Sequence, residues 1–383
     1  MLIGPMFFNF LPPSPRLLRL LILGAWLWGV MFGVPPSGWF LAETKALLKA
    51  ELQTSSSLDW STQESGVLAH LSSVFFLDRE HGWIVGSNGT MLVTEDGGSK
   101  WRRVPLESRE LLRDVFFLNV QRGFALGEYS LFNRPNNLSK ERSFLLASVD
   151  GGASWDDALL AHHTLKPNDP KDYQGDGLLR LLFADERTGW ACGETGLILS
   201  TKDGGQNWHT QISPTRKLLY GMTAVSDKQG WIVGASGVVL RTVDGGQQWN
   251  EQLSNTMQTL RAVHFIDAKR GWAVGAGGTI ISTVNGGSRW RAQSSGVDDD
   301  LNSVFFTSAS EGWAAGDHGA LLHTRDGGTT WERTALKTRS NFTRLFFIAH
   351  DCGWVVGTNG AVFKYQPTDG TPRPTLKNPK LSE

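Results

Sequence analysis

An Asp, in one case Asn, recurs at the same place in six octets of the sequence, each time between a hydroxyl side chain and a pair of glycines. The octets begin with Ser or Thr and end on Trp, as in TRDGGTTW at 324–331. An acidic group beside a hydroxyl could serve as a general acid or base, or as a ligand for a cation such as Ca²⁺. The acidic position is occupied in turn by Asp96, Asp150, Asp203, Asp244, Asn285 and Asp326.

Two properties of the octets favour a role in the fold instead. Asn285 keeps the shape of Asp but loses its charge, which a turn tolerates and an acid–base or metal role does not. Each turn also offers one carboxylate, whereas Ca²⁺ takes about six to eight oxygen ligands. Paired glycines supply the positive φ angles of a tight hairpin, and Asp or Asn can accept hydrogen bonds from the turn's amides. We therefore expect structural turns, with no catalytic residue and no metal.

The octets belong to a repeat of 41 residues. Its second marker is a Gly-Trp dipeptide, whose glycines at 189, 230, 271, 312 and 353 are 41 residues apart, with earlier copies at 82 and, as Gly-Phe, at 123. The interval from 123 to 189 is 66 residues, so extra residues lie there. They fall around YSLFNRPNNLSKER (129–142) and HHTLKPNDPKDYQGDG (162–177), which are polar and rich in Pro, Asn and Asp, as surface loops are.

Each repeat has the pattern of four short strands. Within 301–334, a VFF run and a GWAAG segment have the composition of two buried strands, the alternating ALLHT predicts a third, and WERT after the octet predicts a fourth. Four strands in such a repeat form a propeller blade. Seven repeats therefore predict an all-β fold, a seven-bladed β-propeller of four-stranded antiparallel blades. A solenoid of the same repeats is the alternative.

The two ends of the repeat block predict how the ring closes. The seventh repeat, 342–366, has no Asp-Gly-Gly turn and no fourth strand, while LDWSTQ at 58–63 resembles a fourth strand placed before the first repeat. An N-terminal strand that completes the last blade would leave no long open edge. We predict a propeller over 58–366, with a linker at 43–57 and a disordered tail at 367–383.

The N-terminal segment, 1–42, has the pattern of a signal sequence or a membrane anchor. Arg16 and Arg19 precede an uncharged, largely apolar run at 20–42. Such a run after a basic flank directs a chain to export, and the lack of a clear cleavage site favours an uncleaved anchor. The rest of the chain is then expected on the periplasmic or thylakoid-lumenal face of the membrane.

The composition excludes several classes of function. Lys+Arg and Asp+Glu both number 37, so no net charge points to nucleic acid as a partner. Two cysteines are too few for a disulfide framework or a structural zinc site, and we expect Cys192 and Cys352 to be free thiols. We expect no cofactor, and a monomeric propeller.

The octets resemble the Asp-box, or BNR, motif, which lies at the blade periphery in known Asp-box propellers. These include sialidases, and that resemblance would imply an arginine cluster, a Tyr nucleophile paired with Glu, and an acidic acid–base residue. The chain lacks the Arg-Ile-Pro signature of sialidases, and its only tyrosines are Tyr129, Tyr173, Tyr220 and Tyr365. An exported, sialidase-like carbohydrate-active hydrolase or a glycan-binding module is therefore the alternative function.

The whole repeat block resembles the photosystem II stability and assembly factor family. The likeness covers 58–366 and is visible in GWIVGSNGTMLVTEDGGSKW (82–101) and GWAVGAGGTIISTVNGGSRW (271–290). It implies a non-catalytic propeller that helps a membrane-protein complex to assemble, with an integral membrane protein as partner. Related propellers of non-photosynthetic bacteria resemble envelope accessory proteins for transporters. The uniform blades and the absence of a lipid-accepting cysteine depart from the photosynthetic members, so a bacterial relative outside photosynthesis fits at least as well.

Residues that differ between blades are the candidates for a partner site. Charged side chains occur near one mouth of the ring, where the inner strands start and the second strands end. They are Arg113, Arg180, Arg261, Arg344, Glu128, Glu194 and Asp317. The arginines resemble the arginine patch that the family uses for its partner.

An alternative to partner binding is that these charges pair with one another. The predicted pairs are Arg113 with Glu128 and Arg180 with Glu194. The aligned positions opposite Arg261 and Arg344 are uncharged, so we expect these two arginines to be available for a partner's carboxylate or another anion. The two insertions form a second candidate surface.

Overall fold

The computed structural model describes residues 59–130, 142–158 and 177–367. The expected N-terminal anchor and linker, most of both insertions, and almost all of the expected tail lie outside these residues. Within the described part of the chain, no helix is long and apolar enough to cross a membrane.

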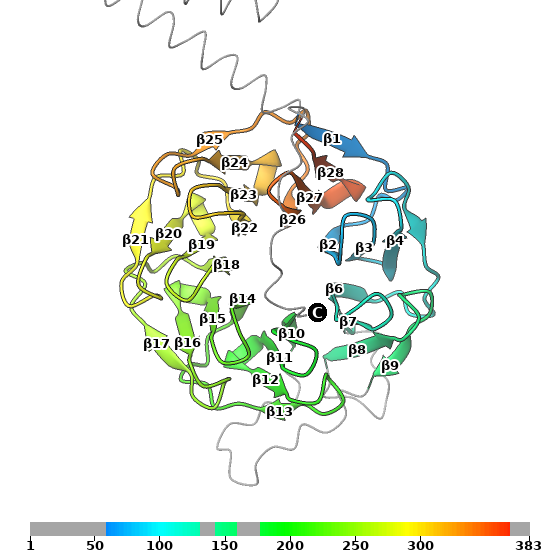
Figure 1. The fold of residues 1–383 in the computed structure, drawn as a ribbon, viewed down its shortest axis with the longest axis horizontal. Helices are drawn as coiled ribbons and strands as arrows, with labels where there is room; N and C mark the ends of the chain where they lie inside the picture. Colours follow the sequence, from blue (N-terminus) through cyan, green and yellow to red (C-terminus); the bar gives the residue numbers. More distant parts are fainter. Residues whose placement is uncertain (1–58, 131–141, 159–176, 368–383) are drawn as a thin grey trace, which may run out of the picture. The chain divides into compact units, whose positions relative to one another are not determined.

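Seven four-stranded antiparallel sheets stand around a common axis and close into a ring (Figure 1). Strands β2 to β25 form six blades that are continuous in sequence, and the seventh combines β26, β27 and β28 with β1. This arrangement confirms the predicted seven-bladed propeller and excludes a solenoid. In each blade the first strand lies nearest the axis and the fourth lies at the periphery (Figure 1).

The strands of blades one to three are β2 (Leu71–Phe76), β3 (Gly82–Gly86), β4 (Thr90–Thr94), β5 (Arg102–Arg103), β6 (Leu111–Phe117), β7 (Gly123–Glu128), β8 (Ser143–Ser148), β9 (Asp156–Ala158), β10 (Leu178–Phe183), β11 (Gly189–Gly193), β12 (Ile198–Thr201) and β13 (His209–Thr210). Those of blades four to six are β14 (Leu219–Ala224), β15 (Gly230–Gly234), β16 (Val239–Thr242), β17 (Asn250–Gln252), β18 (Leu260–Phe265), β19 (Gly271–Gly275), β20 (Ile280–Thr283), β21 (Arg291–Gln293), β22 (Leu301–Phe306), β23 (Gly312–Gly316), β24 (Leu321–Thr324) and β25 (Glu332–Arg333). Blade seven contains β26 (Phe342–Ala349), β27 (Cys352–Gly357), β28 (Val362–Tyr365) and β1 (Trp60–Gln63). Short 3₁₀ turns join the second and third strands of blades three to seven: η2 (Glu194–Gly196), η3 (Ala235–Gly237), η4 (Ala276–Gly278), η5 (Asp317–Gly319) and η6 (Thr358–Gly360).

Strand β1 completes the last blade, as the sequence predicts. It pairs antiparallel with β28, with Trp60 opposite Tyr365 and Gln63 opposite Val362. The Trp60 side chain is 5% exposed, and its ring centroid lies 5.3 Å from that of Trp313 in the neighbouring blade. The first and last described strands are therefore joined by both hydrogen bonds and buried aromatic surface.

Aromatic residues hold each blade against the next. Phe306 at the end of β22 stacks on Trp272 of the preceding blade, with centroids 3.5 Å apart, and meets Trp331 of its own octet edge to face at 5.7 Å. The Trp272 indole also donates a hydrogen bond of 3.0 Å to the Gly327 carbonyl in the next blade. A Cβ on Gly312 would lie 2.5 Å from the Phe306 ring, and a phenylalanine crowds the matching glycine of every blade except the fourth, where Gly230 follows a strand that ends in Ala224.

Candidate functional site

The octet turns share one hydrogen-bond pattern. In the turn at 324–331, the Thr324 hydroxyl donates to Asp326 Oδ1 (2.9 Å) and accepts from the Gly328 amide (2.8 Å), while Asp326 Oδ1 accepts from the Thr330 amide (2.9 Å). Gly327 and Gly328 have φ values of 72° and 90°. The other five turns repeat these bonds, and Asn285 Oδ1 makes them in the fifth blade.

The electrostatics of these turns do not suit proton transfer near neutral pH. Hydrogen bonds from the Ser154 side chain and backbone lower the pKa of Asp150 to about 2. Desolvation raises the pKa of Asp203, but hydrogen bonds from the Asn207 backbone and side chain outweigh it and bring the pKa to about 2. A general acid or base works best with a pKa near the operating pH, and both carboxylates are fully ionised there.

The cysteines and the possible metal-ligating side chains also lack the surroundings of a reactive site. Cys192 and Cys352 are free and buried, and desolvation raises the pKa of both thiols, which disfavours the nucleophilic thiolate. In the described part of the chain, no group of three or more His, Cys, Asp and Glu side chains could hold a metal ion.

The mouth at which the inner strands start, called the rim below, carries an ion-pair network over blades two and three. Arg113 Nε donates to Glu128 Oε2 at 2.6 Å, as the sequence predicts. Arg142, which the sequence analysis missed, lies between two carboxylates, at 2.9 Å from Glu128 Oε1 and 2.5 Å from Glu194 Oε2. The backbone amide of Gly177 also donates to Glu194 (3.1 Å). The network therefore joins the two blades that carry the insertions.

The predicted pair of Arg180 with Glu194 is wrong. Glu194 accepts from Arg142 instead, while the Arg180 side chain is half-buried and its Nε has no hydrogen-bond partner among the described residues. Burial lowers the pKa of Arg180 to about 10, with Arg344 adding to the effect and Asp114 opposing it. Arg180 therefore remains a cation, held in a poorly solvated place.

Arg261 is not available in the way that the sequence predicts. Its Nη2 lies 2.5 Å from Asp300 Oδ2, and its Nη1 donates to Asn302 Oδ1 at 2.7 Å. The other oxygen of Asp300 accepts from the Gly277 amide at 2.8 Å. Asp300 belongs to the linker between β21 and β22, so it comes from outside the aligned strand positions. Its partner Arg261 is about one third exposed on the rim.

Asp317 opens the turn η5 and is engaged within the ring. Its Oδ1 accepts from the Asn302 amide group at 2.8 Å, and the same amide group donates to the Phe342 carbonyl of the seventh blade (2.9 Å). Beside it on the rim, His318 contacts Asp299 at 2.9 Å. Asp317 thus helps to join blades six and seven.

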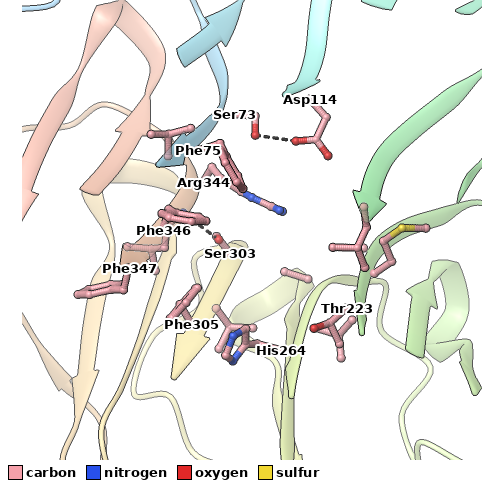
Figure 2. Close-up of a pocket in the computed structure, with 18 of the residues that line it drawn as sticks. Ser73, Phe75, Asp114, Thr223, His264, Ser303, Phe305, Arg344, Phe346 and Phe347 are labelled. Carbon is pink, nitrogen blue, oxygen red and sulfur yellow. Dashed lines mark hydrogen bonds between the residues drawn. The ribbon is translucent and has the colours of Figure 1, made fainter. Parts of the chain in front are cut away.

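Arg344 lies in a different environment from the other rim candidates. It lines a cavity of about 220 Å³ on the axis of the propeller, enclosed by the inner strands (Figure 2). Over the described ranges, the Arg344 side chain makes no hydrogen bond or ion pair. Of the four predicted arginines, the structure therefore places Arg113 and Arg261 in ion pairs, leaves Arg180 half-buried without an ion pair, and directs Arg344 towards the axis.

The fold and the six repeated turns define an Asp-box seven-bladed propeller. Within this class, the sequence matches the family described as photosynthesis system II assembly factor YCF48, over residues 52–177, 172–257 and 250–340. These matches span more than half of the sequence, and the chain belongs to this family.

Several curated relatives have related names. A photosystem II assembly lipoprotein Ycf48 of Synechococcus sp. (strain CC9902) is 27% identical over 169 residues, which are 43% of this chain and 44% of that protein. The photosystem II stability/assembly factor HCF136 of Cyanidioschyzon merolae is 39% identical over 72 residues, 18% of this chain and 16% of that protein. The chain thus aligns with less than half the length of these relatives.

Solved structures match over most of the propeller. A structure described as YCF48 bound to D1 peptide has a TM-score of 0.64 and 25% identity, over 80% of this chain and 95% of that one. YCF48 from Cyanidioschyzon merolae gives a TM-score of 0.65 at 23% identity, over 81% and 99% of the two chains. A GH74 xyloglucanase from Xanthomonas campestris reaches 0.62 at 12% identity, over 82% and 55%, which is a likeness of fold alone.

Proposed function

We propose that this protein is a non-catalytic scaffold that assists the assembly or stability of a membrane-protein complex. The observation that carries the proposal is the match to the assembly-factor family over 52–340. One similar structure is described as bound to a D1 peptide, which makes a peptide segment of an integral membrane protein the kind of partner to expect. The expected N-terminal anchor would hold the propeller on the exported face of that membrane, as a monomer.

The rim is the surface we propose for this partner. Arg113, Arg142 and Arg261 are each about one third exposed while their acidic partners hold them in place. Guanidinium groups oriented in this way can bind a carboxylate of an incoming segment through the donors that remain open. Their positions differ from blade to blade, so the rim offers an asymmetric pattern that can select one partner and one orientation.

The same chemistry argues for a scaffold over a hydrolase. The octet carboxylates that we describe are fully ionised, and the GH74 likeness concerns only the fold. Glycoside hydrolysis generally needs two carboxyl groups on either side of one bond, with one of them protonated. Turnover of a fluorogenic sialoside or polysaccharide by the purified protein would favour the carbohydrate-active alternative.

A matched pair of arginines tests the proposed surface. Arg261 lies near the start of β18, on the rim, and pairs with Asp300. Arg270 lies after the end of the same strand, at the opposite mouth, and pairs with Asp267 at 2.6 Å. The tagged full-length chain is purified from membranes of its own source after cross-linking, and bound integral membrane proteins are quantified. We expect Arg261→Glu and Arg142→Glu to reduce the captured partner by at least about fivefold, because each reverses a rim charge. Arg270→Glu should leave it unchanged.

The outcome also decides between the rim and the insertions. If both rim variants capture the partner normally and removal of 131–141 or 159–176 abolishes capture, the insertions form the surface. If none of these changes matters, the proposed surface is wrong. Capture of a photosystem subunit or of a transporter component would separate the photosynthetic branch from the envelope branch.

A further inference from the structure

The axial cavity combines a cationic layer with an aromatic wall. It is lined by residues of all seven inner strands and has a volume of about 220 Å³. Near the strand starts, its lining includes Ser73, Asp114 and Arg344, and two residues further along the strands it includes Phe75 and Phe346 (Figure 2). Cavities that bind small molecules commonly pair an apolar wall with a few polar groups that fix orientation.

The aromatic wall is a continuous arc across four blades. Ring centroids lie 4.8 Å apart for Phe75 and Phe116, 5.2 Å for Phe75 and Phe346, and 6.0 Å for Phe346 and Phe305. His264 extends the arc, at 4.2 Å from Phe305. Phe305 and Phe346 keep part of their surface exposed to the cavity, so a planar apolar group could pack against them.

In the polar layer, the carboxylate of Asp114 is engaged and the guanidinium of Arg344 is open. Asp114 is already engaged, because Oδ1 accepts from the Ser73 hydroxyl at 2.6 Å and Oδ2 accepts from the Leu181 amide at 3.1 Å. The Arg344 guanidinium has no partner in the described ranges, and Arg180 is close enough for the two cations to influence each other. A guanidinium with open donors beside a second cation favours an anion, above all a carboxylate that it can bind in bidentate geometry.

A polar group occupies the opposite side of the cavity. The Thr223 hydroxyl comes from β14, across the axis from the phenylalanine arc, and makes no hydrogen bond within the part of the chain that the structure describes (Figure 2). It can donate to or accept from a polar substituent on a bound molecule.

We propose that the axial cavity binds a small aromatic carboxylate, with its carboxylate on Arg344 and its ring against Phe346 and Phe305. The volume is below the range of about 300–1,000 Å³ that is typical of drug-sized pockets, so one ring and a short acidic side chain match it. The same chemistry could come from a free aryl acid or from a C-terminal aromatic residue of a peptide. This site is separate from the proposed rim surface and does not depend on it.

Calorimetric titration of the full-length protein in detergent tests the site. The probes are 3-phenylpropionate, its neutral amide, and the peptide Gly-Gly-Gly-Phe with a free or an amidated C-terminus. We expect each carboxylate that binds to exceed its amide at least about tenfold in affinity, because only the charged group pairs with Arg344. Preference for the free acid or for the peptide identifies the source of the ligand.

Variants separate this site from adventitious binding. Arg344→Gln should weaken the carboxylate about tenfold, and Arg344→Lys should restore part of the loss. Phe346→Leu should weaken it severalfold, while Arg291→Gln on the exposed strand β21 should have no effect. Near-ultraviolet circular dichroism verifies that each variant is folded. The proposal fails if no carboxylate binds at about 10 mM, if acid and amide bind equally, or if folded Arg344→Gln binds like the unchanged protein.

Discussion

The two mouths of the propeller differ in how their residues repeat around the ring. On the octet side, six turns make the same internal hydrogen bonds. Each turn also bonds to the loop between the first two strands of its blade; for example, the Gly97 amide donates to the Glu80 carbonyl at 2.9 Å. On the rim, blades two and three share an ion-pair network around Arg142, while blade five uses Asp300 to hold Arg261. Repetition marks the contacts that every blade needs in order to pack, whereas variation marks the surface where the blades have diverged.

The largest effect on stability should follow from removing one phenylalanine side chain from the aromatic packing between blades. Phe306→Ala takes away a buried side chain that contacts Trp272 and Trp331. We expect the free energy of unfolding in denaturant to fall by about 3–5 kcal/mol, since a large cavity replaces the ring. The rim variant Arg261→Gln is the comparison and should change it by less than about 1 kcal/mol. Similar losses for the two variants would contradict the distinction between the mouths.

A smaller effect should follow from a change within one octet turn. Thr324→Val keeps the shape of the side chain but leaves the buried Gly328 amide without its acceptor. We expect a loss of about 1–3 kcal/mol in unfolding free energy, the usual cost of an unsatisfied buried donor. Thr329→Val in the same turn removes an exposed hydroxyl and serves as the control. The two variants should separate clearly in thermal unfolding, and equal midpoints would count against the proposed role of Thr324.

The smallest effect should be a dependence of stability on acidity. The pKa values of Asp150 and Asp203 are about 2 in the folded protein, below the ordinary value of 3.8. Their contribution is therefore fully present above about pH 4 and is lost as the pH falls towards 2. Asn can accept the same bonds, as at Asn285, without titrating. The double variant Asp150→Asn and Asp203→Asn should lose slightly less stability between pH 4 and pH 2 than the unchanged protein. Parallel curves would refute this.

Much of the fold could be predicted from the sequence because its markers have local causes. In every blade except the fourth, the glycine of this marker recurs where a phenylalanine ring leaves no room for a side chain, and each octet closes its own hairpin. The pair of Arg113 with Glu128 was also predictable, since both residues lie on adjacent strands of one blade. Contacts inside a repeating unit are visible in an alignment of the repeats.

The rim was harder to predict because its partners come from segments that such an alignment does not compare. Arg142 lies at the end of an insertion and occupies the carboxylate assigned to Arg180. Asp300 lies in a linker between blades, yet it neutralises Arg261. The position of Arg344 on the axis depends on how seven blades meet, which no single repeat specifies.

Closure of the ring by β1 and β28 has a consequence for the order of folding. Trp60 is synthesised near the start of the chain, but its partner Tyr365 follows only after all the other blades. The loop that must close before this pairing forms spans nearly the whole propeller, and such long-range steps are slow. Until then, two strand edges remain open to pairing with other chains. The seventh blade should thus be the last to mature, and a nascent chain that has not reached β28 should be the form most exposed to misassembly.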